Sequence, residues 1–194
     1  MLKDIKCFVL DMDGTFELGY TLIDGSLEFI ETVEAQGKDF LFLTNNSSRS
    51  GEYYVEKLRN MDCNVERNKI FTSGEATAIY LSRERKDERV YVLGTEFLKE
   101  ELMEYDITVV EDDPDLVVVG FDTTLTYDKL SKTCTYIRNG VPFIATHPDY
   151  NCPTEDGMIP DIGAILAFIK ASTDKDPELI VGKPHRSEEH TSEL

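Results

Sequence analysis

Short, continuous runs of apolar residues alternate along the chain with longer segments in which apolar residues recur every three or four positions. The continuous runs predict strands buried on both faces, and the periodic segments predict helices that pack against them. The expected strands are residues 7–11, 40–44, 90–94, 115–120, 142–146 and 178–182. The expected helices are residues 24–36, 50–61, 74–85, 96–105, 126–139 and 161–172. This alternation predicts an α/β fold in which helices cover both faces of a parallel sheet.

The helix expected over residues 126–139 carries an apolar stripe that predicts its inner face. Tyr127, Leu130, Cys134 and Ile137 recur at helical spacing. We therefore expect all four side chains to face the core.

The charge of the chain excludes some classes of partner. Its 194 residues include 38 acidic and 20 basic ones, which gives a formal net charge of −18. Such a protein repels nucleic acids and anionic membranes, so neither is expected as a partner. The apolar run at residues 7–10 is too short for a signal peptide or a membrane span, and a cytoplasmic location is expected.

Polar residues suited to phosphate chemistry follow three of the expected strands. They are Asp11 and Asp13 after the first strand, Thr44, Asn45 and Asn46 at the end of the second, and Lys183 after the last. In parallel α/β sheets, ligands bind beyond the carboxyl ends of the strands. We therefore expect these side chains to converge at the carboxyl edge of one sheet.

The residue types indicate the chemistry. A pair of carboxylates, Asp11 and Asp13, can hold a divalent cation such as Mg²⁺, which offsets their mutual repulsion. Attack by Asp11 on phosphorus would give an aspartyl-phosphate, and Asp13 could carry the proton to the leaving oxygen. Thr44 and the amides after it would bind phosphate oxygens, and Lys183 would balance charge in the transition state. Gly14 would let the backbone turn sharply.

Each piece also has an ordinary structural explanation. The Asp13–Gly14 pair alone is a common turn, Thr44 alone could cap a helix, and Lys183 before a proline could be a solvated loop residue. The combination at strand ends favours a site. Two alternatives of other classes stay open: a non-catalytic binder of phosphorylated metabolites, and a receiver-like signalling module. The spacing of two between Asp11 and Asp13 argues against the receiver.

Several stretches resemble one known family. DMDGTF at 11–16, TNNSS at 44–48 and VGKP at 181–184 resemble the first three signature motifs of the haloacid dehalogenase-like phosphatases. IFTSGEAT at 70–77 and the long stretch 140–169 resemble the NagD-like and 4-nitrophenylphosphatase-like members.

This resemblance covers nearly all of residues 5–185 and implies a Mg²⁺-dependent phosphatase that acts on a small phosphorylated metabolite. The implied fold is a Rossmann-like parallel sheet core, in two parts over 1–75 and 178–186, with an α/β cap inserted over 76–177. The implied roles are Asp11 as nucleophile, Asp13 as acid and base, both as metal ligands, and Gly14, Thr44, Asn45, Asn46 and Lys183 as phosphate or substrate contacts. Caps in this group often form dimer surfaces, which suggests a homo-oligomer.

Two further residues raise questions within the resemblance. In a capped phosphatase the loop at residues 147–149 would face the active site, so His147 could contact substrate, or it could cap an ordinary turn. Many relatives have a more apolar pair where this chain has Phe16 and Glu17. We expect Glu17 to lie on the surface.

The end of the sequence departs from the family pattern. The family has an acidic motif, GDxxxTD, after the lysine, and its first Asp completes the metal site; this motif is absent here. We therefore expect a core that is incomplete at its C-terminus and an impaired activity. Residues 186–194 match, at all nine positions, the translation of a common sequencing-library adapter. We expect residues 187–194 to be non-native and the natural chain to continue past His185.

Overall fold

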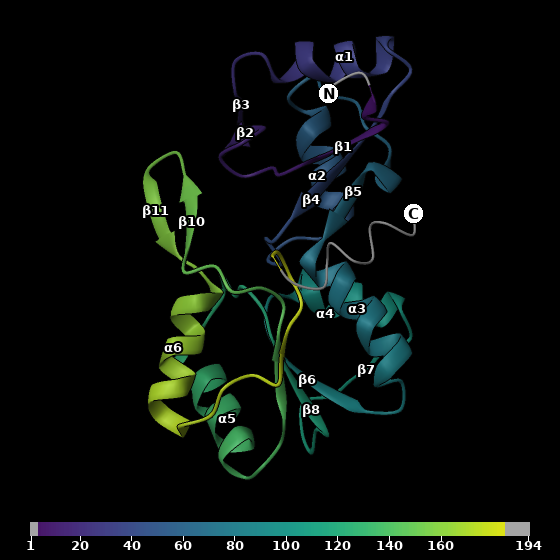
Figure 1. Ribbon diagram of the computed structural model, residues 1–194. Helices are drawn as coiled ribbons and strands as arrows, with labels where there is room; N and C mark the ends of the chain where they lie inside the picture. The colour runs from purple at the N-terminus through teal and green to yellow at the C-terminus, as the bar shows by residue number, and fades with distance from the viewer. Residues whose placement is uncertain (1–3, 185–194) are drawn as a thin grey trace. The chain divides into compact units, whose positions relative to one another are not determined.

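The computed structural model describes residues 4–184, which form two compact units (Figure 1). The first unit comprises residues 4–44, Gly51–Phe71 and Pro153–Ile159. The second unit comprises Asn45–Ser50, Thr72–Cys152 and residues 160–184. The boundaries of these two units differ from those of the expected cap, residues 76–177. The cap therefore stays a prediction. The adapter-like segment, with the proposed non-native residues 187–194, lies outside the described residues.

The first unit is built on a three-stranded sheet with the order β1-β4-β5. Strands β1 and β4 run parallel, with Leu10 opposite Phe42, so both strands end at the same edge. The unit's strands are β1 (Cys7–Leu10), β2 (Glu17–Leu18), β3 (Thr21–Leu22), β4 (Asp39–Thr44) and β5 (Ile70–Thr72). Its helices are α1 (Ser26–Ala35), α2 (Gly51–Arg59) and the short 3-10 helix η2 (Arg67–Lys69). Strands β2 and β3 form a small antiparallel hairpin.

A single cluster of buried side chains holds the first unit together. Phe40 and Phe42 of β4 pack there with Ile30 of α1 and with Tyr54 and Leu58 of α2. Each of these five side chains is at least nine-tenths buried. Burial of such large apolar groups is the main stabilising contribution to the unit, roughly 1.5–3 kcal/mol for each side chain.

The second unit is built on a five-stranded sheet with the order β12-β9-β8-β6-β7, and its strand pairs are parallel. Its strands are β6 (Arg89–Leu93), β7 (Thr108–Val109), β8 (Leu116–Val119), β9 (Phe143–Ala145) and β12 (Leu179–Ile180). Its helices are α3 (Ser73–Glu84), α4 (Glu96–Glu104), α5 (Tyr127–Arg138) and α6 (Ile162–Thr173). The remaining strands, β10 (Asn151–Thr154) and β11 (Gly157–Pro160), pair with each other, and most of their residues belong to the first unit.

Helices α5 and α6 cover one face of the five-stranded sheet, and α3 and α4 cover the other (Figure 1). On β8, Val117 and Val119 belong to the cluster with α5 and α6, whereas Leu116 and Val118 belong to the cluster with α3 and α4. Because successive side chains of a strand point to opposite faces, a strand buried on both faces must be apolar throughout. This explains the continuous run of valines in β8.

The predicted fold class is confirmed, but two details are wrong. The strand before Lys183 was expected in the same sheet as β1 and β4; β12 instead pairs with β9 in the second unit. Tyr127 was expected to face the core, yet it is the first residue of α5 and 77% exposed. Helical spacing does not show where a helix begins, and the first residue of a helix can lie beyond the surface that the helix covers.

Candidate active site

The chain leaves β1 through Asp11, Met12 and Asp13. The Met12 side chain is fully buried in the first unit's core, whereas Asp11 is exposed and Asp13 is half-buried. Residues that alternate in this way point to opposite sides of the backbone. Met12 therefore anchors the segment and leaves the two carboxylates accessible.

A tight turn follows the two carboxylates. The carbonyl oxygen of Met12 accepts hydrogen bonds from the N–H groups of Thr15, Phe16 and Glu17, at 3.1, 2.9 and 3.2 Å. Gly14 has a φ of 78°, in the left-handed region, and its N–H donates to the Glu17 carbonyl oxygen at 2.7 Å. A side chain at position 14 would be strained in this conformation, which is the physical reason for glycine after Asp13.

Glu17 is buried, and the expectation that it lies on the surface is wrong. Its side chain has no exposed area, and one carboxylate oxygen, Oε1, lies 2.7 Å from Nζ of Lys57. Lys57 also lies over the rings of Tyr20 and Tyr54, at 5.6 and 5.8 Å from the ring centroids. Burial raises the pKa of the Glu17 carboxyl; Lys57 lowers it, and the neighbouring Asp13 raises it further.

Thr44 ends β4 with a side chain that is only 1% exposed. Because β1 and β4 are parallel and in register, Thr44 lies at the same sheet edge as Asp11 and Asp13. The first unit thus brings together four of the predicted site residues: Asp11, Asp13, Gly14 and Thr44.

The next residue, Asn45, belongs to the second unit and is held there on several sides. Its side-chain oxygen accepts the N–H of Lys183 at 2.8 Å. Its side-chain nitrogen donates to the Asp149 carboxylate at 2.8 Å and to the Lys183 carbonyl oxygen at 3.2 Å. The Ser73 hydroxyl donates to the Asn45 carbonyl oxygen at 2.5 Å. The second unit therefore brings the predicted residues Asn45 and Lys183 into direct contact.

Ser47 lies at the carboxyl ends of strands in the five-stranded sheet, which the sequence did not predict. Its hydroxyl is 2.9 Å from that of Thr146, which follows β9, and accepts the N–H of Phe121, which follows β8. The side-chain oxygen of the predicted residue Asn46 accepts both the N–H and the hydroxyl of Ser48, at 3.1 and 2.7 Å. In the sequence, the run of short polar residues TNNSS at 44–48 is the feature that indicated hydrogen bonds of this kind.

His147 is fully buried, and both ring nitrogens have partners. Nδ1 lies 2.9 Å from the hydroxyl of Thr146, and Nε2 lies 3.0 Å from the Asp161 carboxylate. Asp161 in turn caps α6, where its carboxylate accepts the N–H of Ile162 at 2.5 Å. The ring therefore makes structural contacts inside the second unit.

Comparison with known proteins decides the family. Residues 8–108 match the model of the haloacid dehalogenase-like hydrolases. The chain is 37% identical to the 5′-nucleotidase YutF of Bacillus subtilis, over 94% of this chain and 71% of that protein. It is 48% identical to the solved 4-nitrophenylphosphatase of Thermotoga maritima, with a TM-score of 0.95, over 99% of this chain and 74% of that one. A solved NagD-type protein is also 48% identical, with a TM-score of 0.96, over 100% of this chain and 77% of that one.

The chain belongs to the haloacid dehalogenase-like hydrolases. The resemblance read from its motifs, including the NagD-like and 4-nitrophenylphosphatase-like subgroup, is confirmed. So is the expectation of an enzyme rather than a receiver-like module, since the family is one of hydrolases.

The donor set of this hydrolase suits a hard cation. Among the described residues, no group of three or more His, Cys, Asp and Glu side chains is placed to hold a metal by itself. Mg²⁺ does not need such a group, because it keeps several waters and usually takes only one or two carboxylates together with substrate phosphate. Asp11 and Asp13 fit this requirement.

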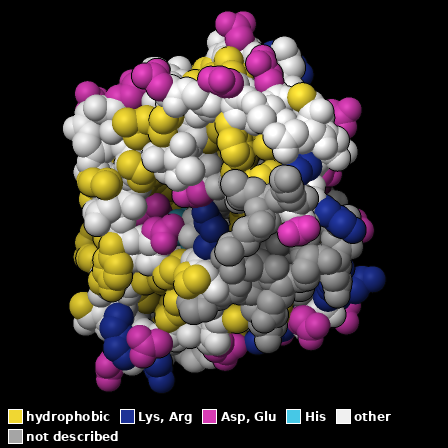
Figure 2. Space-filling model, turned by 45° about the horizontal axis from the view of Figure 1, so that its top comes forward, with side chains coloured by type: hydrophobic (Ala, Val, Ile, Leu, Met, Phe, Trp, Pro, Cys, Tyr) yellow, Lys and Arg dark blue, Asp and Glu magenta, His cyan; other side chains and the backbone are white. Residues whose placement is uncertain are grey.

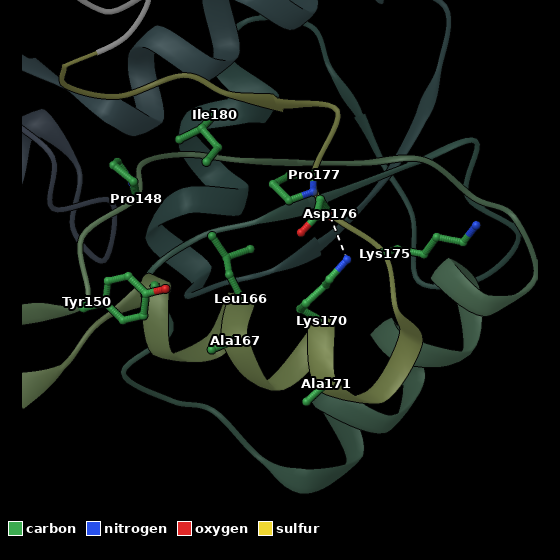
Figure 3. A pocket seen from close by; sticks show the side chains of 11 residues that line it. Pro148, Tyr150, Leu166, Ala167, Lys170, Ala171, Lys175, Asp176, Pro177 and Ile180 are labelled. Atoms are coloured by element: carbon green, nitrogen blue, oxygen red, sulfur yellow. Dashed lines mark hydrogen bonds and ion pairs between the residues drawn. The ribbon is translucent and has the colours of Figure 1, made fainter.

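Asp11 also lines a concave surface of the hydrolase. With Thr15, Ile23 and Asp24 it borders a pocket of about 270 Å³ in the first unit. A second pocket, of about 440 Å³, lies in the second unit between α6 and residues 175–180 (Figure 3). None of the predicted site residues lines this second pocket, and the ion pair of Lys170 and Asp176, at 2.7 Å, lies on its wall.

Acidic side chains occur at many places on the molecular face drawn in Figure 2, in keeping with the net charge of −18. Among the described helices, none combines the length and the apolar character that crossing a bilayer requires.

Proposed function

We propose that the chain hydrolyses small phosphate monoesters through a phosphorylated Asp11. The observation that carries this proposal is the position of Asp11, exposed just after β1 and at the same sheet edge as Thr44. Relatives named as a 5′-nucleotidase and a 4-nitrophenylphosphatase support a phosphomonoester as the class of substrate.

The reaction needs two half-reactions, and Asp13 serves in both. In the first, an oxygen of Asp11 attacks phosphorus, the bond from phosphorus to the ester oxygen breaks, and Asp13 gives its proton to the leaving alcohol. In the second, Asp13 takes a proton from water as the water oxygen attacks phosphorus. The bond between phosphorus and Asp11 then breaks, which releases phosphate and restores both carboxyl groups.

The remaining predicted residues would bind the phosphoryl group. Thr44 and the backbone N–H groups of Asn45 and Asn46 are the proposed donors to its oxygens. The ammonium group of Lys183 would balance the negative charge that remains on these oxygens in a loose transition state. Because His147 is buried with both nitrogens engaged, we leave it out of the proposed substrate contacts.

Asp11 and Asp13 would also hold Mg²⁺. When bound, the ion would neutralise charge on the phosphate oxygens and help to orient the ester for attack by Asp11.

A trapping experiment tests the covalent step. The chain is mixed with 4-nitrophenyl phosphate, quenched in acid, digested and analysed by mass spectrometry. We expect a phosphoryl group on the peptide that contains Asp11, because an acyl phosphate survives acid better than neutral or basic conditions. Asp11→Asn should show none, since an amide oxygen is a poor nucleophile. Nitrophenol release with the phosphoryl group on another residue would contradict the assignment.

A further inference from the structure

The side chain of Asn45 has no hydrogen-bond donor left for a phosphate. A side-chain amide has two N–H donors and one oxygen. Here the nitrogen donates to the Asp149 carboxylate and to the Lys183 carbonyl oxygen, and the oxygen accepts the Lys183 N–H. Only this orientation of the amide satisfies all three neighbours, since its nitrogen faces two acceptors and its oxygen faces a donor.

The surroundings of Asn45 leave this arrangement little freedom. Asn45 is 9% exposed. A Cβ added at Gly182 would lie 2.7 Å from the Asn45 side-chain oxygen and 2.6 Å from the Thr146 carbonyl oxygen. Glycine at position 182 therefore permits the close approach that brings the Lys183 backbone against Asn45.

We propose that Asn45 is a positioning residue: its side chain clamps both backbone groups of Lys183 and links them to Asp149. This inference rests on the proposed phosphatase function. It assigns to the Asn45 side chain a different task from the phosphate contact implied by the family resemblance, and it adds Asp149 to the residues on which turnover depends. Because Thr44 precedes Asn45 by one peptide bond, the clamp also ties Lys183 to the segment that leaves β4.

The consequence for the reaction is orientation of the lysine. A lysine side chain has four rotatable bonds, and a fixed backbone limits the positions that its ammonium group can reach. Groups aimed at developing charge are most effective when no reorganisation is needed during the reaction. Loss of the clamp should therefore reduce kcat more than it raises KM.

A charge-swap cycle tests the clamp. Asn45→Asp keeps the shape and the oxygen that accepts the Lys183 N–H, but places a second carboxylate against Asp149. We expect kcat/KM for 4-nitrophenyl phosphate to fall by about 10- to 100-fold. Adding Asp149→Asn removes the repulsion and supplies a donor from the other side, so the double variant should recover part of this loss. The bond to the Lys183 carbonyl oxygen stays lost in both variants. Asn60→Asp, which adds the same charge at an exposed position after α2, is the control.

A direct phosphate contact predicts the opposite result for the double variant. A carboxylate at position 45 would then repel the phosphoryl group whatever occupies position 149. If Asn45→Asp/Asp149→Asn is as slow as Asn45→Asp alone, the proposal is overturned.

Hydrogen exchange separates failure of the clamp from failure of the proposed function. In the parent chain the Lys183 amide should be protected, because it donates to Asn45. In Asn45→Ala its exchange should be at least about tenfold faster, a change that does not depend on catalysis. Equal exchange in both chains would overturn the clamp, even if the parent is an active phosphatase. A third outcome is possible: Asn45→Ala loses the protection, but the parent chain releases no nitrophenol. That outcome would support the clamp and count against the proposed phosphatase function.

Discussion

At the scale of single residues, the pairing of Glu17 with Lys57 shows most clearly what the sequence left hidden. Position 17 follows a turn and carries a charge, which is the usual pattern of a surface residue. Its burial depends on Lys57, 40 positions later in the chain, whose ammonium group approaches to 2.7 Å. No local pattern connects these two residues.

A double-mutant cycle should show that this pair is strongly coupled. Glu17→Gln leaves the buried Lys57 ammonium without its counter-charge, and such a loss typically costs about 3–5 kcal/mol of unfolding free energy. Replacing both residues, as Glu17→Gln with Lys57→Met, removes the uncompensated charge and should cost less than Glu17→Gln alone. Urea unfolding of the parent and the variants measures this.

The exposed pair of Glu52 and Arg67 offers a matched control. Its nitrogen and oxygen lie 2.8 Å apart, but the Glu52 side chain is 60% exposed. We expect Glu52→Gln to change the unfolding free energy by less than about 1 kcal/mol. A loss for Glu17→Gln no larger than for Glu52→Gln would contradict the account of the buried pair.

At the scale of elements, helices were easier to predict than strands. The six expected helices all occur, because their apolar spacing and end signals are local features of the sequence. The short strands β2, β3, β5, β7, β10 and β11 were not predicted, since two to four residues give too little pattern. The place of β12 was also wrong, because which strand pairs with which depends on contacts between distant residues.

The N-cap of α5 provides a test at this scale. The Thr126 hydroxyl accepts the N–H of Lys129 at 3.2 Å, and Thr126 is exposed. Thr126→Ala should therefore lower stability by about 1 kcal/mol, or roughly 2–4 °C in the melting temperature. Thr126→Ser keeps the hydroxyl and should melt close to the parent in differential scanning calorimetry. Equal melting temperatures for the Ala and Ser variants would show that this cap contributes nothing.

At the scale of the whole molecule, the predicted site residues fall into two groups, one in each compact unit. Asp11, Asp13, Gly14 and Thr44 belong to the first unit, and Asn45, Asn46 and Lys183 belong to the second. The sequence predicted these residues because each follows an apolar strand. It did not predict that the strands belong to different sheets, nor that the side chain of Asn45 would be fully engaged with its neighbours.

We propose that Asp11 and Mg²⁺ together make this chain a phosphatase. The most direct test is hydrolysis of 4-nitrophenyl phosphate by the chain, with Mg²⁺ and with the metal removed by a chelator, beside Asp11→Asn. We predict nitrophenol release that requires Mg²⁺ and disappears in Asp11→Asn, while circular dichroism shows the variant folded like the parent. Turnover by Asp11→Asn at the parent's rate, or turnover that persists without Mg²⁺, would contradict the claim.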